Sequence, residues 1–413
     1  MTAETLYSIR RTIWIGFGFL GVSLVWALYN TYVPVLLKER FLFGSAQVGW
    51  VGTANNLLTL LLLPVFGAWS DRTPHPRGKR FPFILLGAPL GGLLFAGIPT
   101  VAGLASPSLF IFGLCAFNLA MATFRSPLIA LMPDFTPSAD RSRANAIINL
   151  MGGLGALLAY FGGKKLHDAF PQSPFQAGGL LLILACGTTL FMVRERPRRL
   201  DPVSGPRHLG AFEDLFAGLR EVFRAPEKSP VFLLFSVLSW FMGFSAIGMF
   251  FTTYSKFYLS WSEADGGLVL GFFARAFIAS AVGAGRLSLR FGRTRVVQAG
   301  LLALVAAMSA LPLAHSFFGV AGFMVLAGIS WAWVTVNSLP MLLDSVPAIR
   351  IGAYTGVYYL FSMAGAVIAP PIAGAAMDRI GYAALPGTCA GFFALAFVCM
   401  LGVHRGEARK ETQ

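Results

Sequence analysis

The sequence predicts an all-α polytopic membrane protein with twelve transmembrane helices in two pseudo-symmetric six-helix bundles. Three observations predict this fold class. Hydrophobic residues make up 56% of the 413-residue chain and charged residues only 12%, against roughly 25% charged residues in a soluble domain. The apolar residues fall in runs of about 20 or more, the length that a helix needs to cross a membrane. A short basic loop also occurs twice, once in each half of the chain.

The apolar runs are continuous, which indicates helices, because a spanning helix satisfies its backbone hydrogen bonds internally. A transmembrane β-barrel would alternate apolar and polar residues instead. The first run is too long for the apolar region of a cleavable signal peptide. We expect spans at 12–37, 46–69, 81–104, 108–133, 143–166, 176–193, 230–256, 265–289, 295–314, 317–343, 351–377 and 383–403.

The basic residues orient these spans. With the N-terminus in the cytoplasm, 24 of the 32 Lys and Arg residues fall in cytoplasmic segments and six on the opposite side. Cytoplasmic loops are normally enriched in Lys and Arg. We therefore expect a multi-pass protein of the cytoplasmic (inner) membrane with both termini in the cytoplasm. This distribution accounts for the net charge of +14 without a nucleic-acid partner.

The longest polar stretch, 194–229, divides the chain into an N-terminal six-helix bundle, 1–193, and a C-terminal one, 230–404. A cytoplasmic tail follows at 405–413. Within 194–229 apolar residues recur at helical spacing. This linker helix is either an amphipathic helix on the cytoplasmic membrane face or a helix packed under the bundle.

The repeated basic loop indicates that the two halves are duplicated. Gly67 and Arg72 of the first copy correspond to Gly285 and Arg290 of the second, both at an offset of 218 residues. Such internal repeats are typical of transporters.

The two copies differ at one position, where the first has Asp71 and the second has Leu289. A second pair of matching positions, Asp134 and Asp344, ends spans four and ten at an offset of 210 residues.

The pattern Gly67-x-x-x-Asp71-Arg72, closed by 78–80, resembles the signature loop of the major facilitator superfamily, and the resemblance covers essentially the whole chain. Its longer form, 70–84, is similar to that of the glycoside–pentoside–hexuronide/cation symporters and the sucrose–proton transporters. Residues 124–134, 337–340 and 352–359 fit the same group.

This resemblance implies a rocker-switch mechanism, in which two bundles open alternately to each side of the membrane around a site lined by spans one, four, seven and ten. It implies that Asp71 helps to close the cytoplasmic side, and it favours a monomer surrounded by membrane lipids. A carboxylate near a helix N-terminus gains from the helix dipole. Leu289 accepts no hydrogen bond, so unequal closure of the two halves is expected.

The predicted coupling or gating residues are the acidic and basic groups at the cytoplasmic helix ends. They are Asp134, Asp71, Arg72, Arg80 and Arg290.

Two arginines lie inside spans, Arg125 in span four and Arg275 in span eight, and Asn118 lies seven residues before Arg125 on the same helix face. Charges within a membrane are costly and mark candidate functional sites. The alternative is a structural partnership with backbone carbonyls. No Asp or Glu lies in the middle of a span, unlike in the sugar/cation branch. Asp134 is the nearest candidate partner for Arg125.

Neutral polar and aromatic side chains complete the predicted substrate site: Asn30, Asn149, Asn337, Trp333 and Tyr358, beside Arg125, Arg275 and Asn118. Amides offer donors and acceptors, and aromatic faces can stack on sugar rings. The alternative is interhelical hydrogen bonding and packing. Small residues in span five predict a close-packing surface: Gly152, Gly153, Gly155, Ala159, Gly162 and Gly163.

Two functions follow from these residues. The first is secondary active transport of a sugar or glycoside by alternating access, with a proton or another cation as the expected co-transported ion. The second is transport or exchange of an anionic solute, an organic acid or sugar phosphate, bound by Arg125 and Arg275, because guanidinium suits bidentate recognition of such groups. We find no catalytic triad, P-loop or metal-ligand spacing in the sequence, so no enzyme activity, catalytic residue, metal or cofactor is expected.

Overall fold

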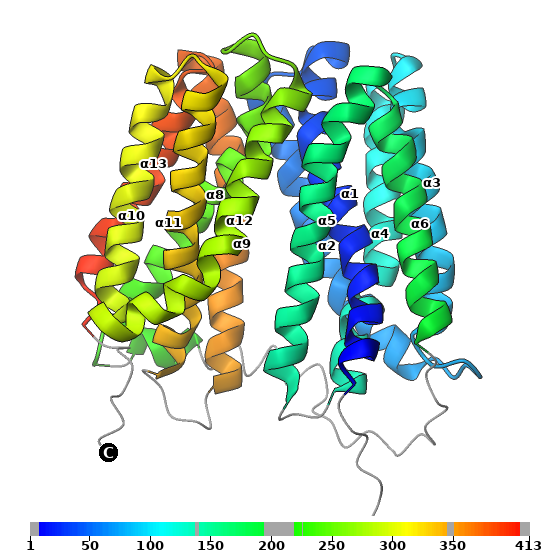
Figure 1. Cartoon of the computed structure of the whole chain (residues 1–413), viewed down its shortest axis with the longest axis horizontal. Coiled ribbons are helices and arrows are strands. Elements are labelled where there is room, and N and C mark those ends of the chain that lie inside the picture. Colours follow the sequence, from blue (N-terminus) through cyan, green and yellow to red (C-terminus); the bar gives the residue numbers. More distant parts are fainter. Residues whose placement is uncertain (1–7, 137–139, 194–218, 225, 345–350, 405–413) are drawn as a thin grey trace, which may run out of the picture. The chain divides into compact units, whose positions relative to one another are not determined.

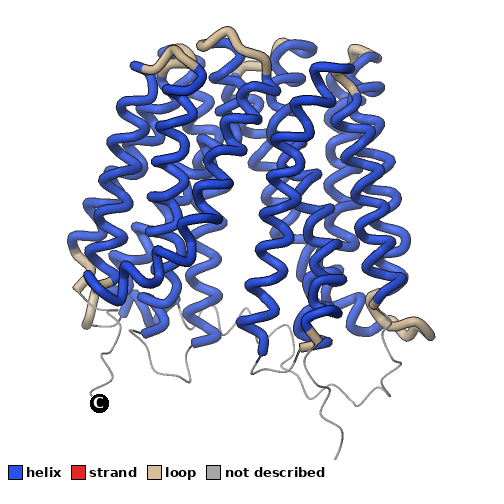
Figure 2. The backbone as a smooth tube through the Cα atoms, viewed as in Figure 1, coloured by secondary structure: helices blue, strands red, loops and turns tan. Residues whose placement is uncertain are grey.

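The computed structural model describes residues 8–136, 140–193, 219–224, 226–344 and 351–404. These residues form helices joined by short connections (Figure 2). Among them, twelve helices are long and apolar enough to cross a membrane, which confirms the predicted fold class. The predicted linker helix lies mostly outside the described residues, although 219–224 is helical.

The chain separates into two compact units. Unit 1 falls within Met1–Leu42 and Ala54–Ser204, and unit 2 within Phe43–Thr53 and Gly205–Gln413. One helix, α2, is therefore divided between them.

Unit 1 contains α1, most of α2, and α3 to α6 (Figure 1). Helix α1 packs along α5 and α6, and α3 packs along α4 and α6. The helices are α1 (Ile9–Phe41), α2 (Ser45–Arg72), α3 (Phe81–Gly103), α4 (Pro107–Phe135), α5 (Arg141–Ala169) and α6 (Ser173–Met192).

Unit 2 contains the start of α2 and the helices from α8 onward. Helix α8 packs along α12 and α13, and α11 packs along α9 and α10. The helices are α8 (Ser229–Phe257), α9 (Glu263–Phe291), α10 (Arg293–Ala310), α11 (Phe317–Asp344), α12 (Ile351–Ile380) and α13 (Ala384–Leu401), with a 3₁₀ turn, η2 (Leu311–Leu313), after α10.

Local sequence explains where several helices begin. Ser106 accepts a hydrogen bond from the Leu109 amide and Pro107 follows it at the first helical position, where a missing N–H costs nothing. Ser262 and Asp265 form a reciprocal capping box at the start of α9, which satisfies two amides that have no partner within the helix.

Small residues allow α1 and α5 to approach closely, as the glycine pattern of span five predicts. A Cβ at Gly155 would lie 2.1 Å from the Leu20 carbonyl oxygen, and one at Gly163 would lie 2.9 Å from Leu28 Cδ2. Gly162 departs from the prediction, because a Cβ there would meet no atom within 4 Å. The packing surface is thus one face of α5, not all of its small residues.

We predict that Gly155→Ala destabilises the protein by about 1–3 kcal/mol, the usual cost of forcing a methyl group into a packed interior. Gly162→Ala on the same helix is the matched control and should leave the stability unchanged or slightly raised. The midpoint of thermal unfolding in detergent measures both. Equal midpoints for the two variants would contradict the predicted contact.

Candidate functional site

A guanidinium connects three segments of unit 1. Arg80 immediately precedes α3, and its side chain is only 5% exposed. Its Nη2 donates to Asp71 Oδ1 at 2.6 Å, and its Nε donates to Asp134 Oδ2 at 3.1 Å. Its Nη1 donates to the Gly67 carbonyl at 3.4 Å and also to the Ser70 hydroxyl. Arg80 therefore ties the end of α2 to the end of α4.

Lys79 completes this group, which we call the Arg80 cluster: Asp71, Lys79, Arg80 and Asp134. Lys79 Nζ lies 3.1 Å from Asp71 Oδ1 and 4.0 Å from Asp134 Oδ2. Two carboxylates thus face two cations, so the cluster as a whole is neutral. A buried guanidinium is stable only when its charge and its donors are both compensated.

The structure pairs Asp134 with Arg80 rather than with Arg125. Both Asp134 and Arg125 lie on α4. Nine residues separate them, which is about 13 Å along a helix that rises 1.5 Å per residue. The start of α3 brings Arg80 directly to the end of α4, where Asp134 lies.

Unit 2 repeats part of this arrangement. Arg293, at the start of α10, forms an ion pair with Asp344 at the end of α11, as Arg80 does with Asp134. The position equivalent to Asp71 is Leu289, whose side chain is largely exposed. The second half therefore keeps the arginine-to-aspartate bridge and lacks the additional carboxylate, so the two halves differ as the sequence indicated.

The backbone of the basic loop is repeated as well. The glycine shortly before each arginine has a positive φ, 110° at Gly78 and 89° at Gly292, a conformation that residues with a Cβ rarely adopt. Ser288 donates its hydroxyl to the carbonyl three residues earlier at 2.7 Å, as Ser70 does at 2.8 Å. The duplication thus extends to local geometry.

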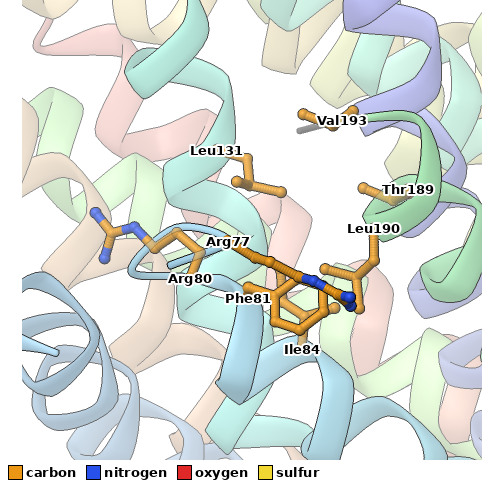
Figure 3. Close-up of a pocket in the computed structure, with 8 residues that line it drawn as sticks. All are labelled: Arg77, Arg80, Phe81, Ile84, Leu131, Thr189, Leu190 and Val193. Atoms are coloured by element: carbon orange, nitrogen blue, oxygen red, sulfur yellow. The ribbon is translucent and has the colours of Figure 1, made fainter. Parts of the chain in front are cut away.

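A small pocket lies beside the Arg80 cluster. Figure 3 shows that Arg80 directs its guanidinium away from this pocket, whereas Arg77 extends across the Phe81 ring, with its Cζ 5.3 Å from the ring centroid. The mostly apolar lining offers little to a polar substrate. It consists of Arg77, Arg80, Phe81, Ile84, Leu131, Thr189, Leu190 and Val193.

Arg125 has a different environment from Arg80. Its Cζ lies 5.8 Å from the centroid of the Trp26 ring on α1, within the range of a cation–π interaction. Among the described residues, no hydrogen bond or ion pair to Arg125 is present. The alternative prediction was a structural contact from Arg125 to backbone carbonyls, and no such hydrogen bond is present among the described residues. The guanidinium keeps five donors for another partner.

Trp26 belongs to an aromatic group with Tyr29 and Phe117, whose ring centroids lie 5.4 and 6.0 Å from that of Trp26. Asn118 is buried and donates from Nδ2 to the Leu114 carbonyl at 2.8 Å. The Asn118 side chain also interacts with the Tyr29 hydroxyl, while its Oδ1 atom and the Trp26 Nε1 atom are buried without a hydrogen bond of normal geometry. Burying such a group without a partner costs about 1–3 kcal/mol of folding free energy. A hydrogen bond to a bound polar molecule would offset this cost.

We use the name unit 1 polar patch for Trp26 and Arg125, which contact each other, together with Asn118, which lies about 10 Å before Arg125 along α4. Sequence reasoning identified Asn118 and Arg125 but missed Trp26. A signal was available, because Trp26 lies four residues, about one helical turn, before the predicted site residue Asn30, in a span that the family resemblance places at the cavity.

The predicted residues of unit 2 are not brought together in the same way. Arg275, on α9, is exposed. Asn337 is buried and donates from Nδ2 to the Trp333 carbonyl of its own helix at 2.8 Å. The Tyr358 hydroxyl lies 2.8 Å from Ser338 Oγ. Asn337 and Tyr358 thus have partners within unit 2, as the packing alternative expects.

An aromatic group in unit 2 was not predicted. Trp331 stacks on Phe244 with ring centroids 4.3 Å apart and an interplanar angle of 5°, and Phe241 meets it edge-on at 5.5 Å. The prediction named Trp333. Two residues correspond to about 200° around a helix, so the two tryptophans lie on different faces of α11, and the sequence alone does not say which face packs.

The remaining predicted residues are exposed or half-buried. Asn149, Arg72 and Arg290 are exposed, and Asn30 is half-buried. Arg290 Cζ lies 5.1 Å from the centroid of the Phe291 ring. Within the described part of the chain, no group of three or more His, Cys, Asp or Glu residues could hold a metal ion.

Comparison with known proteins gives consistent results. A family model described as the Major Facilitator Superfamily matches residues 15–288 and 256–413. The chain is 31% identical over 220 residues to the proton-associated sugar transporter A of Homo sapiens. The aligned region covers 48% of this chain and 29% of that protein. It is 26% identical over 262 residues to the sucrose transport protein SUT3 of Oryza sativa subsp. japonica, covering 55% and 51% respectively. The matched region therefore spans about half, or less, of these relatives.

Solved structures share the fold. The nucleoside transporter NupG has a TM-score of 0.72 at 15% identity, covering 95% of this chain and 99% of that one. A bacterial homologue of the human lysosomal transporter Spinster, in an inward-facing and occupied conformation, has a TM-score of 0.66 at 15% identity, covering 95% and 93%.

We predict that Arg80→Ala destabilises the protein by about 2 kcal/mol or more, because it leaves two carboxylates without their shared guanidinium. This value is below the cost of breaking a fully buried pair, since Asp71 is 39% exposed. Arg72→Ala is the matched control, and an exposed residue of this kind changes stability by about 0.5 kcal/mol or less. Thermal unfolding in detergent measures both, and similar midpoints would contradict the role assigned to Arg80.

Proposed function

The chain belongs to the Major Facilitator Superfamily, and we propose that it is a secondary active transporter that moves a sugar or glycoside across the cytoplasmic membrane by alternating access. The observation that supports a sugar is the unit 1 polar patch. The curated relatives named above, a proton-associated sugar transporter and a sucrose transport protein, favour the same class of solute.

The chemistry of the patch suits a sugar. The C–H face of a sugar ring packs on an aromatic face such as that of Trp26. Asn118 Oδ1, which is buried without a donor, would accept a hydrogen bond from a sugar hydroxyl. The Arg125 guanidinium would donate to other hydroxyl or ring oxygens. These three groups come from α1 and α4, two helices that line the cavity in the family that the sequence resembles.

Proton coupling is part of the proposal, since one relative is named as proton-associated. The Asp and Glu residues of the described spans lie within three residues of a helix end. A protonatable carboxylate would therefore act at the ends of the helices, and Asp71 and Asp134 of the Arg80 cluster are the candidates in unit 1. We also propose, from the distribution of Lys and Arg, that both termini are cytoplasmic.

A second candidate function is transport of an anionic solute. It is favoured by one observation: Arg125 has no acidic partner among the described residues. A carboxylate or phosphate would neutralise this charge and pair with the planar guanidinium through two hydrogen bonds.

Uptake into proteoliposomes separates these two functions. The purified protein is reconstituted and tested against a panel of neutral sugars, glycosides, organic acids and sugar phosphates, with and without an imposed pH gradient. Competition by neutral sugars supports the first function. Competition by carboxylates or phosphates alone contradicts it and supports the second.

We predict that Arg125→Ala and Arg275→Ala each reduce transport by about 100-fold or more while membrane insertion is unchanged, because a substrate-binding guanidinium is worth several kcal/mol. Arg125→Lys should retain little activity if the contact is bidentate. Lys165→Ala, an exposed cation at the end of α5, is the matched control and should transport normally. Normal uptake by both alanine variants would show that these arginines do not bind the solute.

A further inference from the structure

One arginine in the loop between α2 and α3 takes no part in the Arg80 cluster. Arg77 is exposed, and its side chain makes no hydrogen bond or ion pair with another described residue. Its Cζ atom lies 5.3 Å from the centroid of the Phe81 ring. A cation–π contact of this kind leaves the five N–H donors of the guanidinium available to an anion.

The neighbouring acids do not balance the charge of Arg77. Asp71 and Asp134 are each bound by Arg80, at 2.6 and 3.1 Å, and each lies within 4.0 Å of Lys79 Nζ. Both carboxylates of the Arg80 cluster are therefore already paired. Arg77 keeps an unbalanced positive charge at the ends of the membrane-spanning helices.

The loop around Arg77 is ordered by its own contacts. The His75 ring stacks on the Phe81 ring, with centroids 5.2 Å apart and 14° between the planes. The Arg77 amide donates to His75 Nδ1 at 3.2 Å. Pro74 and Pro76 flank His75 and restrict the backbone further. Because the loop is ordered beforehand, binding an anion at Arg77 costs little additional conformational entropy.

The small pocket beside Arg77 is lined mainly by hydrocarbon and lies entirely within unit 1, at the ends of α3, α4 and α6 (Figure 3). Ile84, Leu131 and Val193 are buried, and Leu190 is half-buried. The Arg77 side chain extends across the Phe81 ring at the same pocket. A charged group and an apolar surface thus lie side by side.

The other polar groups of the pocket lining are already used. The Thr189 hydroxyl lies 2.9 Å from the Trp14 carbonyl oxygen and 3.1 Å from the Ala185 carbonyl oxygen, so its single donor is satisfied within the protein. Arg80 directs its guanidinium away from the pocket (Figure 3). Arg77 alone in this lining has donors to spare. A ligand that fits both parts of the site joins an anionic group to a hydrocarbon chain.

The surface next to the pocket is suited to lipid chains. Leu86 of α3 is 72% exposed and Phe191 of α6 is 71% exposed. Large apolar side chains that a spanning helix exposes are compatible with lipid tails, which are as apolar as leucine. Arg77 precedes α3 by four residues, which places it at the level of the lipid head groups.

We propose that Arg77 and this pocket form a binding site for one anionic phospholipid, the Arg77 lipid site. The guanidinium binds the phosphate through two hydrogen bonds, and one acyl chain lies against Phe81 and Leu190. Basic pockets between spanning helices bind anionic head groups in this way. A zwitterionic lipid suits the site less well, because it carries a cation beside its phosphate. This inference goes beyond the proposed transport function and does not depend on the solute.

Native mass spectrometry of the delipidated full-length protein in detergent, titrated with dioleoyl phosphatidylglycerol, tests the site. Arg77→Ala should weaken binding of the tightest-bound lipid about fivefold, the factor that one basic residue contributes near an anionic surface. Arg77→Lys keeps the charge and should retain most of the affinity. Arg295→Ala, the matched control, removes an exposed arginine at the start of α10 and should change nothing. Wild-type affinity in Arg77→Ala, or an equal loss in Arg295→Ala, would overturn the proposal.

Thermal unfolding in detergent separates a lipid from a free anion. Dioleoyl phosphatidylglycerol should raise the unfolding midpoint of the wild type more than that of Arg77→Ala, whereas dioleoyl phosphatidylcholine should raise both equally. Inorganic phosphate should not distinguish the two proteins. If inorganic phosphate reproduces the difference, the site holds a free anion and the lipid assignment is wrong.

The acyl-chain half of the site has its own variant. Leu190→Ser removes apolar surface from the pocket and should reduce the shift in midpoint that phosphatidylglycerol causes, and an unchanged shift would contradict the placement of the chain. Neither the mass measurement nor the unfolding measurement needs a transported solute. Failure of the lipid site and failure of the proposed function are therefore distinguishable.

Discussion

The rest of the structure depends on one constraint: polar groups removed from water must find partners within the protein. The apolar stretches satisfy it by becoming helices, whose backbone bonds are internal. Where the sequence breaks that rule, another segment compensates. Pro371 leaves the Val367 carbonyl without its usual donor, and the Thr53 hydroxyl takes that place. The first amides of α2 face the Asp378 carboxylate. These compensating contacts are also the ones that connect distant parts of the chain.

The same constraint distinguishes the two arginines of unit 1. Arg80 is compensated by two carboxylates, a carbonyl and a hydroxyl, so its charge is fully used in holding α2, α3 and α4 together. Arg125 has an aromatic face and no described acid. One arginine is therefore structural in character and the other has binding capacity to spare. Together with the unpartnered oxygen of Asn118, that capacity is the strongest physical argument for a solute site in this half of the protein.

Much of this could be predicted from the sequence because it depends on one-dimensional properties. Span positions follow from hydropathy, and the duplication follows from the basic loop. The aspartates of the ion pairs Arg80–Asp134 and Arg293–Asp344 lie at positions that the sequence had already marked as equivalent in the two halves. The sequence suggested Asp134 as the nearest candidate partner of Arg125, whereas the structure pairs Asp134 with Arg80, which the start of α3 brings to the end of α4. It missed Trp26 and Trp331 because apolar helices show little difference between faces, so hydropathy does not reveal which aromatic side chains point inward.

By itself, the sequence determined the membrane fold, the number of spans and the unequal basic loops, since each depends on residue type and spacing along the chain. Only the tertiary structure decided which charged side chains form ion pairs and which have no oppositely charged partner among the described residues. It set Arg80 against Asp134, placed Trp26 beside Arg125, and brought Asp378 to the first turn of α2. The physical reason is that a hydrogen bond or ion pair requires atoms within about 3 Å of each other. Helix packing, with its dependence on glycine contacts and helix rotation, fixes those distances, and residue order does not.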